Sequence, residues 1–477
     1  MGLLQRIDDK SARVCVLGLG YVGLPLAVKL ADVGYRVTGL DTSEGKVASL
    51  KAGKSYIQDV ATSDVARLIG SRLFATTDYD VVRDVEVIFI CVPTPFDAMK
   101  APNLHDIESA ASGIAPRLHA GQLVILQSTT YPGTTEDKVL PILEASGLKA
   151  GKDFNLAFSP ERINPGDKVY HVGNLPKVVG GLTPECAELA RRLLLHLSPA
   201  VYVVSSPRAA EMSKLLENIF RSVNIALVNE LALLCERMEI DIWEVIRAAA
   251  TKPFGFMPFY PGPGTGGHCI PVDPYYLSWK AREYDFYTKF IELAAEVNQS
   301  MPYHVVDLVA AGLSRQGKVL CGAHVLVLGV AFKKDVDDAR NSPAERIIEL
   351  LLERGVEVSY NDPYVPQFHI ERSVFYHEEK TLTSQPLTEE LLHGADCVVV
   401  VAGHTAYDYP WIARNCGLLV DSVNATAGVQ AEGAEIVRLG TPGAAQGRSV
   451  RCASSVRSTA PPTPSGKALR RAGYPCP

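Results

Sequence analysis

Apolar and polar positions alternate along the chain in a way that divides it into three folded parts. From residue 1 to about residue 205, short apolar runs rich in β-branched residues alternate with helical segments. Strands are expected at Arg13–Leu17, Tyr35–Leu40, Val85–Val92 and Leu123–Gln127, and near 155–158, 177–180 and 201–204. Strands that alternate with helices predict a parallel, doubly wound Rossmann-like sheet for residues 1–205.

The second part, residues 206–316, has only helical periodicity. Apolar residues recur every three or four positions from Ser206 to about Met238, which predicts one long helix. Further helices are expected over 241–251 and 294–315. A helical connector between two α/β domains often supplies a dimer interface, so we expect a homodimer or a higher homo-oligomer.

Strands and helices alternate again over residues 317–438, which predicts a second Rossmann-like domain. The fold class is therefore α/β, with two Rossmann-like doubly wound domains joined by an all-helical middle domain. The first strand of the second domain runs into Gly329-Val-Ala-Phe332, which lacks the GxGxxG pattern. This domain should bind something other than a dinucleotide, or bind one differently. Residues 439–477 are mainly Gly, Ala, Ser, Pro and Arg, and are expected to form a disordered tail.

Composition excludes several classes of protein. A chain of 477 residues is long enough for two or three domains. Its net charge of −6 includes six basic residues in the tail, so the rest is more acidic still, which argues against a nucleic-acid-binding enzyme. The ten cysteines form no CxxC pair or zinc-spaced cluster, which favours reduced thiols and no metal. We find no run long enough to span a bilayer and no signal peptide, so a cytoplasmic protein is expected.

A dinucleotide fingerprint follows the first predicted strand. Gly18-Leu-Gly20-Tyr-Val-Gly23 opens a helix, and Asp41 ends the next strand. In this setting Gly18 makes the tight turn, Gly20 lets the backbone approach a pyrophosphate, and Gly23 lets helix and strand pack. The pyrophosphate would lie at the helix N-terminus. Asp41 would accept hydrogen bonds from a ribose and repel a 2′-phosphate, which favours NAD over NADP.

Polar residues follow other predicted strands, at the carboxyl edge where ligands bind in doubly wound sheets. Thr94 and Thr129 each come directly after such a strand, and their hydroxyls could contact the nicotinamide half of the cofactor or act as ordinary caps. Glu161, in Ser159-Pro-Glu161-Arg162, places a carboxylate on the same edge. A solvated surface glutamate is the competing interpretation.

The long helix carries a second set of polar residues. Glu211, Lys214, Asn218 and Arg221 recur at three- and four-residue spacing, so they lie on one face. A solvent-facing stripe is the usual explanation. Lys214 and Asn218, however, have apolar neighbours in a helix that looks largely buried, where polar groups need partners.

The most unusual segment is Gly255–Pro274, GFMPFYPGPGTGGHCIPVDP, which is crowded with glycine and proline. Its glycines allow the backbone to press close to a ligand. The glycine-rich loop within it ends on Cys269, and Asp273 follows four residues later. From these residues alone, a structural turn with a small buried cysteine remains an alternative to a ligand-binding loop.

Seven motifs occur in order and together resemble the UDP-glucose/UDP-N-acetylhexosamine 6-dehydrogenase family, over roughly residues 11–430. They are GLGYVGLPLA, CVPTP, STTYPGTT, FSPER, EMSKLLENIFRSVNIALVNELA, GPGTGGHCIPVDP and VLVLGVAFKKDVDDARNSPA. GGHC, FGFMPFYPGPG, SPERINPG and YYLSWKAREY are similar to the branch that acts on UDP-N-acetylglucosamine.

The resemblance implies a two-step, four-electron oxidation at C6 of a UDP-sugar with two NAD⁺, giving a uronate. Cys269 would attack an aldehyde to form a thiohemiacetal, which loses hydride to give a thioester that water hydrolyses. Lys214 and Asn218 would stabilise the oxyanion, and the Lys214 cation would lower the pKa of the thiol. Asp273, with Thr129 and Glu161, would orient water and move protons.

The resemblance also implies the binding contacts. UDP would lie against the Gly264–Gly267 backbone, near Phe259 and Tyr260, and reach Phe332 and Lys333 of the second Rossmann-like domain. The remaining substrate contacts are expected at Glu161, Arg162, Lys214 and Asn218. The expected NAD contacts are Gly18, Gly20, Tyr21, Val22, Gly23, Asp41, Lys46, Thr94, Thr129 and Arg340.

Two positions depart from the family pattern. Pro165 stands where many members have a second glutamate, and Val423, in Asp421-Ser-Val423-Asn424, stands where an arginine is usual. The second departure removes a charge expected near the substrate.

Three alternatives stay open on the sequence. The same chemistry could act on UDP-N-acetylmannosamine or UDP-glucose. A two-electron hydroxyacid dehydrogenase of the 6-phosphogluconate type would not need Cys269. A nucleotide-sugar sensor would keep the fold without turnover.

Overall fold

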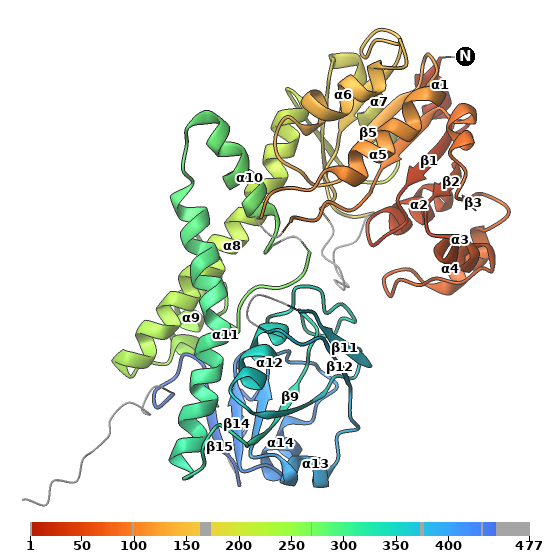
Figure 1. Cartoon of the computed structure of the whole chain (residues 1–477). Helices are drawn as coiled ribbons and strands as arrows, with labels where there is room; N and C mark the ends of the chain where they lie inside the picture. Colours follow the sequence, from red (N-terminus) through yellow and green to blue (C-terminus); the bar gives the residue numbers. More distant parts are fainter. Residues whose placement is uncertain are drawn as a thin grey trace, which may run out of the picture.

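The computed structural model describes residues 2–97, 100–162, 173–268, 270–372, 376–430 and 433–444. It has the expected architecture: an N-terminal sheet domain, a helical middle and a C-terminal sheet domain (Figure 1). The α/β fold class with two Rossmann-like domains and an all-helical middle is thus confirmed. Cys269 and Pro165 lie outside the residues that the structure describes.

The N-terminal sheet has eight strands in the order β3-β2-β1-β4-β5-β6-β7-β8. Strands β1, β4 and β5 are almost wholly apolar because helices cover both faces of the sheet. The predicted parallel pairing holds from β3 to β6, whereas β7 runs antiparallel to β6 and pairs in parallel with β8. The strands are β1 Arg13–Leu17, β2 Arg36–Leu40, β3 Leu73–Thr76, β4 Val87–Ile90, β5 Leu123–Leu126, β6 Asn155–Phe158, β7 Lys177–Gly181 and β8 Val201–Val204.

Helices flank this sheet and connect its strands. The helix α2 begins at the last glycine of the fingerprint, and α7 packs against β7 and β8. The helices of this domain are α1 Leu3–Asp8, α2 Gly23–Asp32, α3 Glu44–Lys51, α4 Thr62–Leu68, α5 His105–Ile114, α6 Leu140–Glu144 and α7 Pro184–Leu195.

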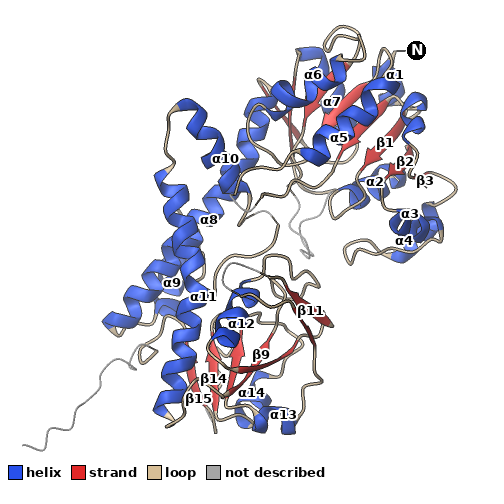
Figure 2. Ribbon diagram, in the orientation of Figure 1, coloured by secondary structure: helices blue, strands red, loops and turns tan. Residues whose placement is uncertain are grey.

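Two long helices, α8 Pro207–Met238 and α11 Lys289–Arg315, run side by side through the middle domain (Figure 2). The N-terminus of α8 is capped by Ser206, whose hydroxyl accepts a hydrogen bond from the Ala209 N–H at 3.2 Å. The other helices here are α9 Ile242–Ala250 and α10 Asp273–Ala281. The helix expected over 294–315 begins five residues earlier, at Lys289.

The faces of α8 are the reverse of an ordinary amphipathic helix. Glu211, Lys214 and Asn218 are buried, whereas Leu216 and Leu227 are 60% and 50% exposed. The solvent-facing explanation of the polar stripe is therefore wrong for these three residues, although Arg221 is exposed. By length and composition alone α8 could cross a membrane, with an 18-residue window of mean hydropathy 1.2, which the sequence reading had not found. Its buried polar stripe shows that one face packs against protein.

The C-terminal sheet has five parallel strands in the order β10-β9-β13-β14-β15. Its strands are β9 His324–Leu328, β10 Glu357–Asn361, β13 Cys397–Val400, β14 Leu418–Asp421 and β15 Glu435–Arg438, and a separate hairpin is formed by β11 Gln367–Ile370 and β12 Lys380–Thr383. Its helices are α12 Pro343–Glu353, α13 Glu389–Gly394 and α14 Tyr409–Arg414. Sequence reasoning missed β15 and the hairpin.

The expected tail begins too early at residue 439. Leu439 is buried, and its carbonyl accepts a hydrogen bond from the Trp243 indole at 2.8 Å. The Gly440 N–H donates to Glu236 Oε1 of α8 at 2.7 Å. Residues 439–444 therefore pack against the middle domain, and the remainder of the predicted tail lies outside the described residues.

Candidate active site

The glycines of the fingerprint divide into packed and open positions. A Cβ on Gly18 would lie 2.6 Å from the Cys91 carbonyl oxygen, and one on Gly23 would lie 1.8 Å from the Gly18 carbonyl oxygen. No atom lies within 4 Å of the Cβ position of Gly20. The backbone at Gly20 thus faces open space at the start of α2, as a pyrophosphate-binding loop requires.

Asp41 stands beside this loop at the end of β2. Its carboxylate accepts hydrogen bonds from the Leu19 N–H at 2.8 Å and the Ser43 N–H at 2.9 Å, and Lys46 Nζ lies 3.2 Å away. The Tyr56 hydroxyl donates to the Leu19 carbonyl at 2.8 Å. Tyr56 was not predicted, because nothing in its local sequence links it to the glycine loop.

Arg340 joins the N-terminal and C-terminal domains at the same loop. Its guanidinium lies 4.7 Å from the ring centroid of Tyr21, between Gly20 and Val22 in the fingerprint. The Arg340 carbonyl accepts a hydrogen bond from the Gly267 N–H at 3.0 Å. The glycine-rich segment, the fingerprint and the C-terminal domain therefore meet here, and the residues present fit a bound dinucleotide.

A buried polar cluster lies where α8 meets the start of α10. Asn218 Nδ2 donates to Asp273 Oδ2 at 2.5 Å, and both side chains are buried with Lys214. Burial raises the pKa of Asp273 to about 7, against the opposing effects of the Lys214 cation and the Asn218 hydrogen bond. Asp273 can therefore exchange a proton near neutral pH. Three of the five residues expected to act with Cys269 therefore come together here, namely Lys214, Asn218 and Asp273.

Glu161 is held by buried partners that sequence reasoning missed. Its Oε2 accepts from Gln127 at 2.7 Å and lies 3.0 Å from Lys177 Nζ, and its Oε1 accepts from the Arg162 N–H at 2.8 Å. Arg162 itself pairs with Glu217 of α8 at 2.8 Å. The sequence held one signal for Lys177, because it is the charged first residue of the otherwise uncharged strand β7.

The ends of β4 and β5 are tied to each other and to α10. Ser128 Oγ donates to the Val92 carbonyl at 2.7 Å. The buried Thr94 accepts a hydrogen bond on its carbonyl from the Tyr276 hydroxyl. Thr129 follows Ser128 and is partly exposed on the same edge.

Glu211 anchors the next segment to α8. Its buried carboxylate accepts from the Gly133 N–H at 2.6 Å and from the Thr135 N–H at 2.9 Å. This clamp fixes the loop after β5, which includes Thr129, against the helix that carries Lys214 and Asn218. Its role is structural.

A cavity of about 660 Å³ lies between the glycine-rich segment and the carboxyl edge of the C-terminal sheet. Four of the predicted substrate-binding residues line this cavity, namely Tyr260, Gly264, Phe332 and Lys333. Val423 also lines it. Two predicted residues lie beside it instead, since Gly267 packs against the ring of Phe332 and Phe259 packs edge-on against Phe220 at 5.6 Å.

Comparison with known proteins agrees with this layout. Residues 12–198, 208–300 and 326–427 match the NAD binding, central and UDP binding domains of the UDP-glucose/GDP-mannose dehydrogenase family. The chain belongs to this family. It is an NAD-dependent UDP-sugar dehydrogenase, an oxidoreductase, which sets aside the sensor alternative.

Individual relatives align with most of the length of this chain. It is 40% identical over 358 residues to the UDP-N-acetyl-D-glucosamine 6-dehydrogenase of Pseudomonas aeruginosa, covering 75% of this chain and 84% of the relative. It is 36% identical over 415 residues to Protein CapL of Staphylococcus aureus, covering 86% and 95%. Its fold matches a UDP-D-ManNAc dehydrogenase from Pyrococcus horikoshii with a TM-score of 0.80 and 31% identity, covering 90% and 99%.

The two kinds of glycine in the fingerprint give a matched test of NAD binding. In Gly20→Val the new side chain enters the open space of the loop, so the affinity for NAD should fall by about 10-fold or more while the melting temperature stays near that of wild type. In Gly23→Val the side chain meets the Gly18 carbonyl, so the protein should lose stability. Calorimetric NAD titration and thermal melting measure both; unchanged NAD affinity in Gly20→Val would contradict the assignment.

The raised pKa of Asp273 predicts a pH-dependent stability. The folded dehydrogenase holds this proton more tightly than the unfolded chain does, so the stabilisation is complete below pH 3.8 and is lost as pH rises through about 7. Thermal melts of wild type and Asp273→Asn should therefore differ in slope over this range, with the wild type losing stability relative to the variant. Glu211, whose pKa burial also raises to about 7, is common to both proteins and cancels. Parallel curves would show that Asp273 has an ordinary pKa.

Proposed function

We propose that the enzyme oxidises C6 of a UDP-N-acetylhexosamine, with UDP-N-acetylglucosamine as the best candidate, to the uronate. The observation that carries this proposal is the buried Lys214–Asn218–Asp273 cluster. Asp273 follows Cys269 by four residues in the chain. The identity to the Pseudomonas aeruginosa enzyme supports the choice of sugar. A uronate of this kind would serve as a precursor of surface polysaccharide.

The overall chemistry removes four electrons from one carbon. Bound NAD supplies the hydride acceptor, and one alcohol, two NAD⁺ and one water give one carboxylate, two NADH and three protons. An aldehyde cannot donate the second hydride until a nucleophile has added to its carbonyl carbon. The Cys269 thiolate would form that C–S bond, and water would break it again when the thioester is hydrolysed.

The described residues have distinct tasks in this scheme. The buried Lys214 cation and the Asn218 amide would stabilise the oxyanion that forms when sulfur adds to the aldehyde. Asp273, with a pKa raised by burial to about 7, would accept and return the protons. Glu161, fixed by Lys177 and Gln127, would orient water or a sugar hydroxyl together with Thr129.

The nucleotide would lie in the 660 Å³ cavity. Lys333 and Lys334 give the cavity positive charge that suits a diphosphate, and Tyr260 and Phe332 provide aromatic surface. Val423 lines the same cavity, so the charge that the family pattern would place there is absent from this wall. UDP-N-acetylmannosamine remains the alternative sugar, because the structural relative from Pyrococcus horikoshii acts on it by its name. UDP-glucose is the third candidate.

Replacement of the proposed nucleophile separates four-electron from two-electron chemistry. In Cys269→Ser, uronate formation from UDP-N-acetylglucosamine should fall by about a thousandfold or more, because the second hydride donor cannot form. Product analysis by mass spectrometry, with NAD and UDP affinities as controls for folding, makes the measurement. Retention of wild-type uronate formation would contradict the covalent mechanism.

An apolar face of the middle domain supports a homodimer. Leu216, Phe220, Leu227 and Leu234 follow one side of α8 and are all exposed, and Phe290 at the start of α11 is 78% exposed. Several large apolar side chains exposed along one side of a long helix are typical of a protein interface. A second copy of this chain would cover it.

A charge on this face should separate the subunits. Leu227→Glu places a carboxylate in the proposed interface, so the mass measured by analytical ultracentrifugation should fall to that of a monomer at micromolar concentration. Arg221→Gln, a charge change at an exposed position about a third of a turn away from this face on the same helix, should leave the mass unchanged. A wild-type monomer, or an unchanged mass in Leu227→Glu, would contradict a dimer through α8.

We also infer a cytoplasmic enzyme. The seven cysteines in the described part of the chain are all free thiols, and six of them are buried. Such thiols are typical of a reducing compartment.

A further inference from the structure

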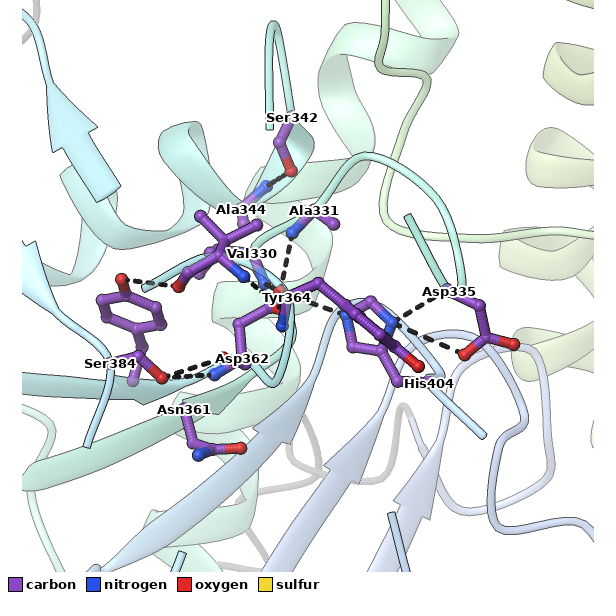
Figure 3. Close-up of polar contacts among 12 residues, drawn as sticks. Val330, Ala331, Asp335, Ser342, Ala344, Asn361, Asp362, Tyr364, Ser384 and His404 are labelled. Carbon is purple, nitrogen blue, oxygen red and sulfur yellow. Dashed lines mark hydrogen bonds and ion pairs between the residues drawn. The ribbon is translucent and has the colours of Figure 1, made fainter. Parts of the chain in front are cut away.

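A buried histidine joins the loops at the carboxyl edge of the C-terminal sheet (Figure 3). His404 is fully buried, and the Asp335 N–H donates to its Nδ1 at 2.9 Å. Its Nε2 lies 3.1 Å from Asp362 Oδ2. Because a backbone amide can only donate, Nδ1 accepts and the ring proton is on Nε2, which donates it to Asp362.

Asp362 extends the contact to the start of the loop that follows β9. Its Oδ2 also accepts hydrogen bonds from the Val330 and Ala331 N–H groups at 2.7 and 3.0 Å. Its Oδ1 accepts from the Tyr364 N–H at 2.8 Å. A fully buried carboxylate is thus saturated by the loop on one side and the imidazole on the other.

Asp335 secures the other end of the same loop. It has a left-handed backbone with φ of 59°, which a residue with a side chain adopts only when its surroundings hold it. Its carboxylate accepts from the Thr405 N–H and hydroxyl at 2.8 and 3.0 Å. One imidazole therefore ties down residues 330–331 and residue 335, and the segment between them presents Phe332 and Lys333 to the cavity.

The N-terminal domain has the same arrangement with a different neighbour. Asp41 follows β2 as Asp362 follows β10, and each accepts hydrogen bonds from the loop after the adjacent first strand. Gly18 and Gly329 are also equivalent, since a Cβ on either would meet a carbonyl oxygen, that of Cys91 or Ala402, at 2.6 or 2.5 Å.

The neighbour of the carboxylate distinguishes the two domains. Asp41 has the partly exposed Lys46 beside it, whereas Asp362 has the buried His404. An imidazole therefore fills the place next to Asp362 that corresponds to the ribose position of a dinucleotide site. The C-terminal domain therefore keeps the Rossmann loop geometry, but the side chain of its own His404 occupies the position beside the carboxylate.

We propose that His404 is a positioning residue for the UDP-sugar. It replaces the ribose of a dinucleotide as the partner of the strand-end carboxylate, and it fixes the loop that carries Phe332 and Lys333 in its cavity-lining shape. The inference rests on the proposed function, because it takes the 660 Å³ cavity as the nucleotide site.

The test compares UDP and NAD binding by calorimetry in the full-length enzyme. His404→Leu removes both contacts of the ring, so the Kd for UDP should rise by about 10-fold or more while the Kd for NAD stays within about 2-fold of wild type. Gln and Asn each retain one polar contact, so His404→Gln and His404→Asn should give intermediate losses. In turnover, the KM for the UDP-sugar should rise with little change in kcat.

A second histidine of the same domain provides the control. His324 opens β9 at the opposite edge of the sheet, and its Nε2 lies 2.8 Å from Ser359 Oγ. His324→Gln should lower the melting temperature without changing UDP affinity.

Four outcomes would count against the inference. UDP affinity equal to wild type in a folded His404→Leu would overturn it, as would equal losses of UDP and NAD affinity. If that variant does not fold, unchanged UDP affinity in both His404→Gln and His404→Asn has the same meaning. A wild-type protein that binds no UDP would overturn the proposed function and this inference together.

Discussion

The hydrogen bond from Asn218 to Asp273, buried beside the Lys214 cation, is the contact on which the site depends. Burial disfavours the charged form of Asp273, and the Lys214 cation and the Asn218 hydrogen bond each offset part of that cost. The contact fixes the end of the glycine-rich segment to α8. The earlier part of that segment is fixed to the C-terminal domain, where the Gly267 N–H bonds the Arg340 carbonyl. The segment thus joins α8 of the middle domain to the C-terminal domain, whose Arg340 lies against Tyr21 of the N-terminal domain.

The two Rossmann-like domains share a strand-end carboxylate that binds the glycine loop, but they differ in what lies beside that carboxylate. Both end a strand on a carboxylate that accepts hydrogen bonds from the preceding glycine loop. In the N-terminal domain the open side of Gly20 leaves room for a pyrophosphate. In the C-terminal domain His404 occupies the equivalent polar position, and the loop that it fixes lines the 660 Å³ cavity. One architecture therefore serves both as the NAD binding domain and as the UDP binding domain of the same chain.

The sequence was informative where a local pattern has one structural meaning. GxGxxG after a strand, the helical period of α8 and the polar Lys214–Asn218 pair predicted the glycine loop, the long helix and the buried polar cluster. It was uninformative where the structure depends on contacts between distant segments. Lys177, Gln127 and Glu211 act through partners 16 to 78 residues away, and no spacing rule identifies such pairs. The exposure of Leu216 and Leu227 could not be predicted either. Helical periodicity identifies an apolar face, but it does not show whether that face packs inside the same chain or is left exposed.

The most direct test of the account is the number of NADH molecules formed per UDP-sugar consumed, measured for each candidate sugar with limiting substrate. The account predicts two NADH and one uronate per sugar, with the highest kcat/KM on UDP-N-acetylglucosamine. A ratio of one, with an aldehyde or ketone as the final product, would contradict the four-electron mechanism. A ratio of two on UDP-N-acetylmannosamine or UDP-glucose alone would keep the mechanism and overturn the choice of sugar.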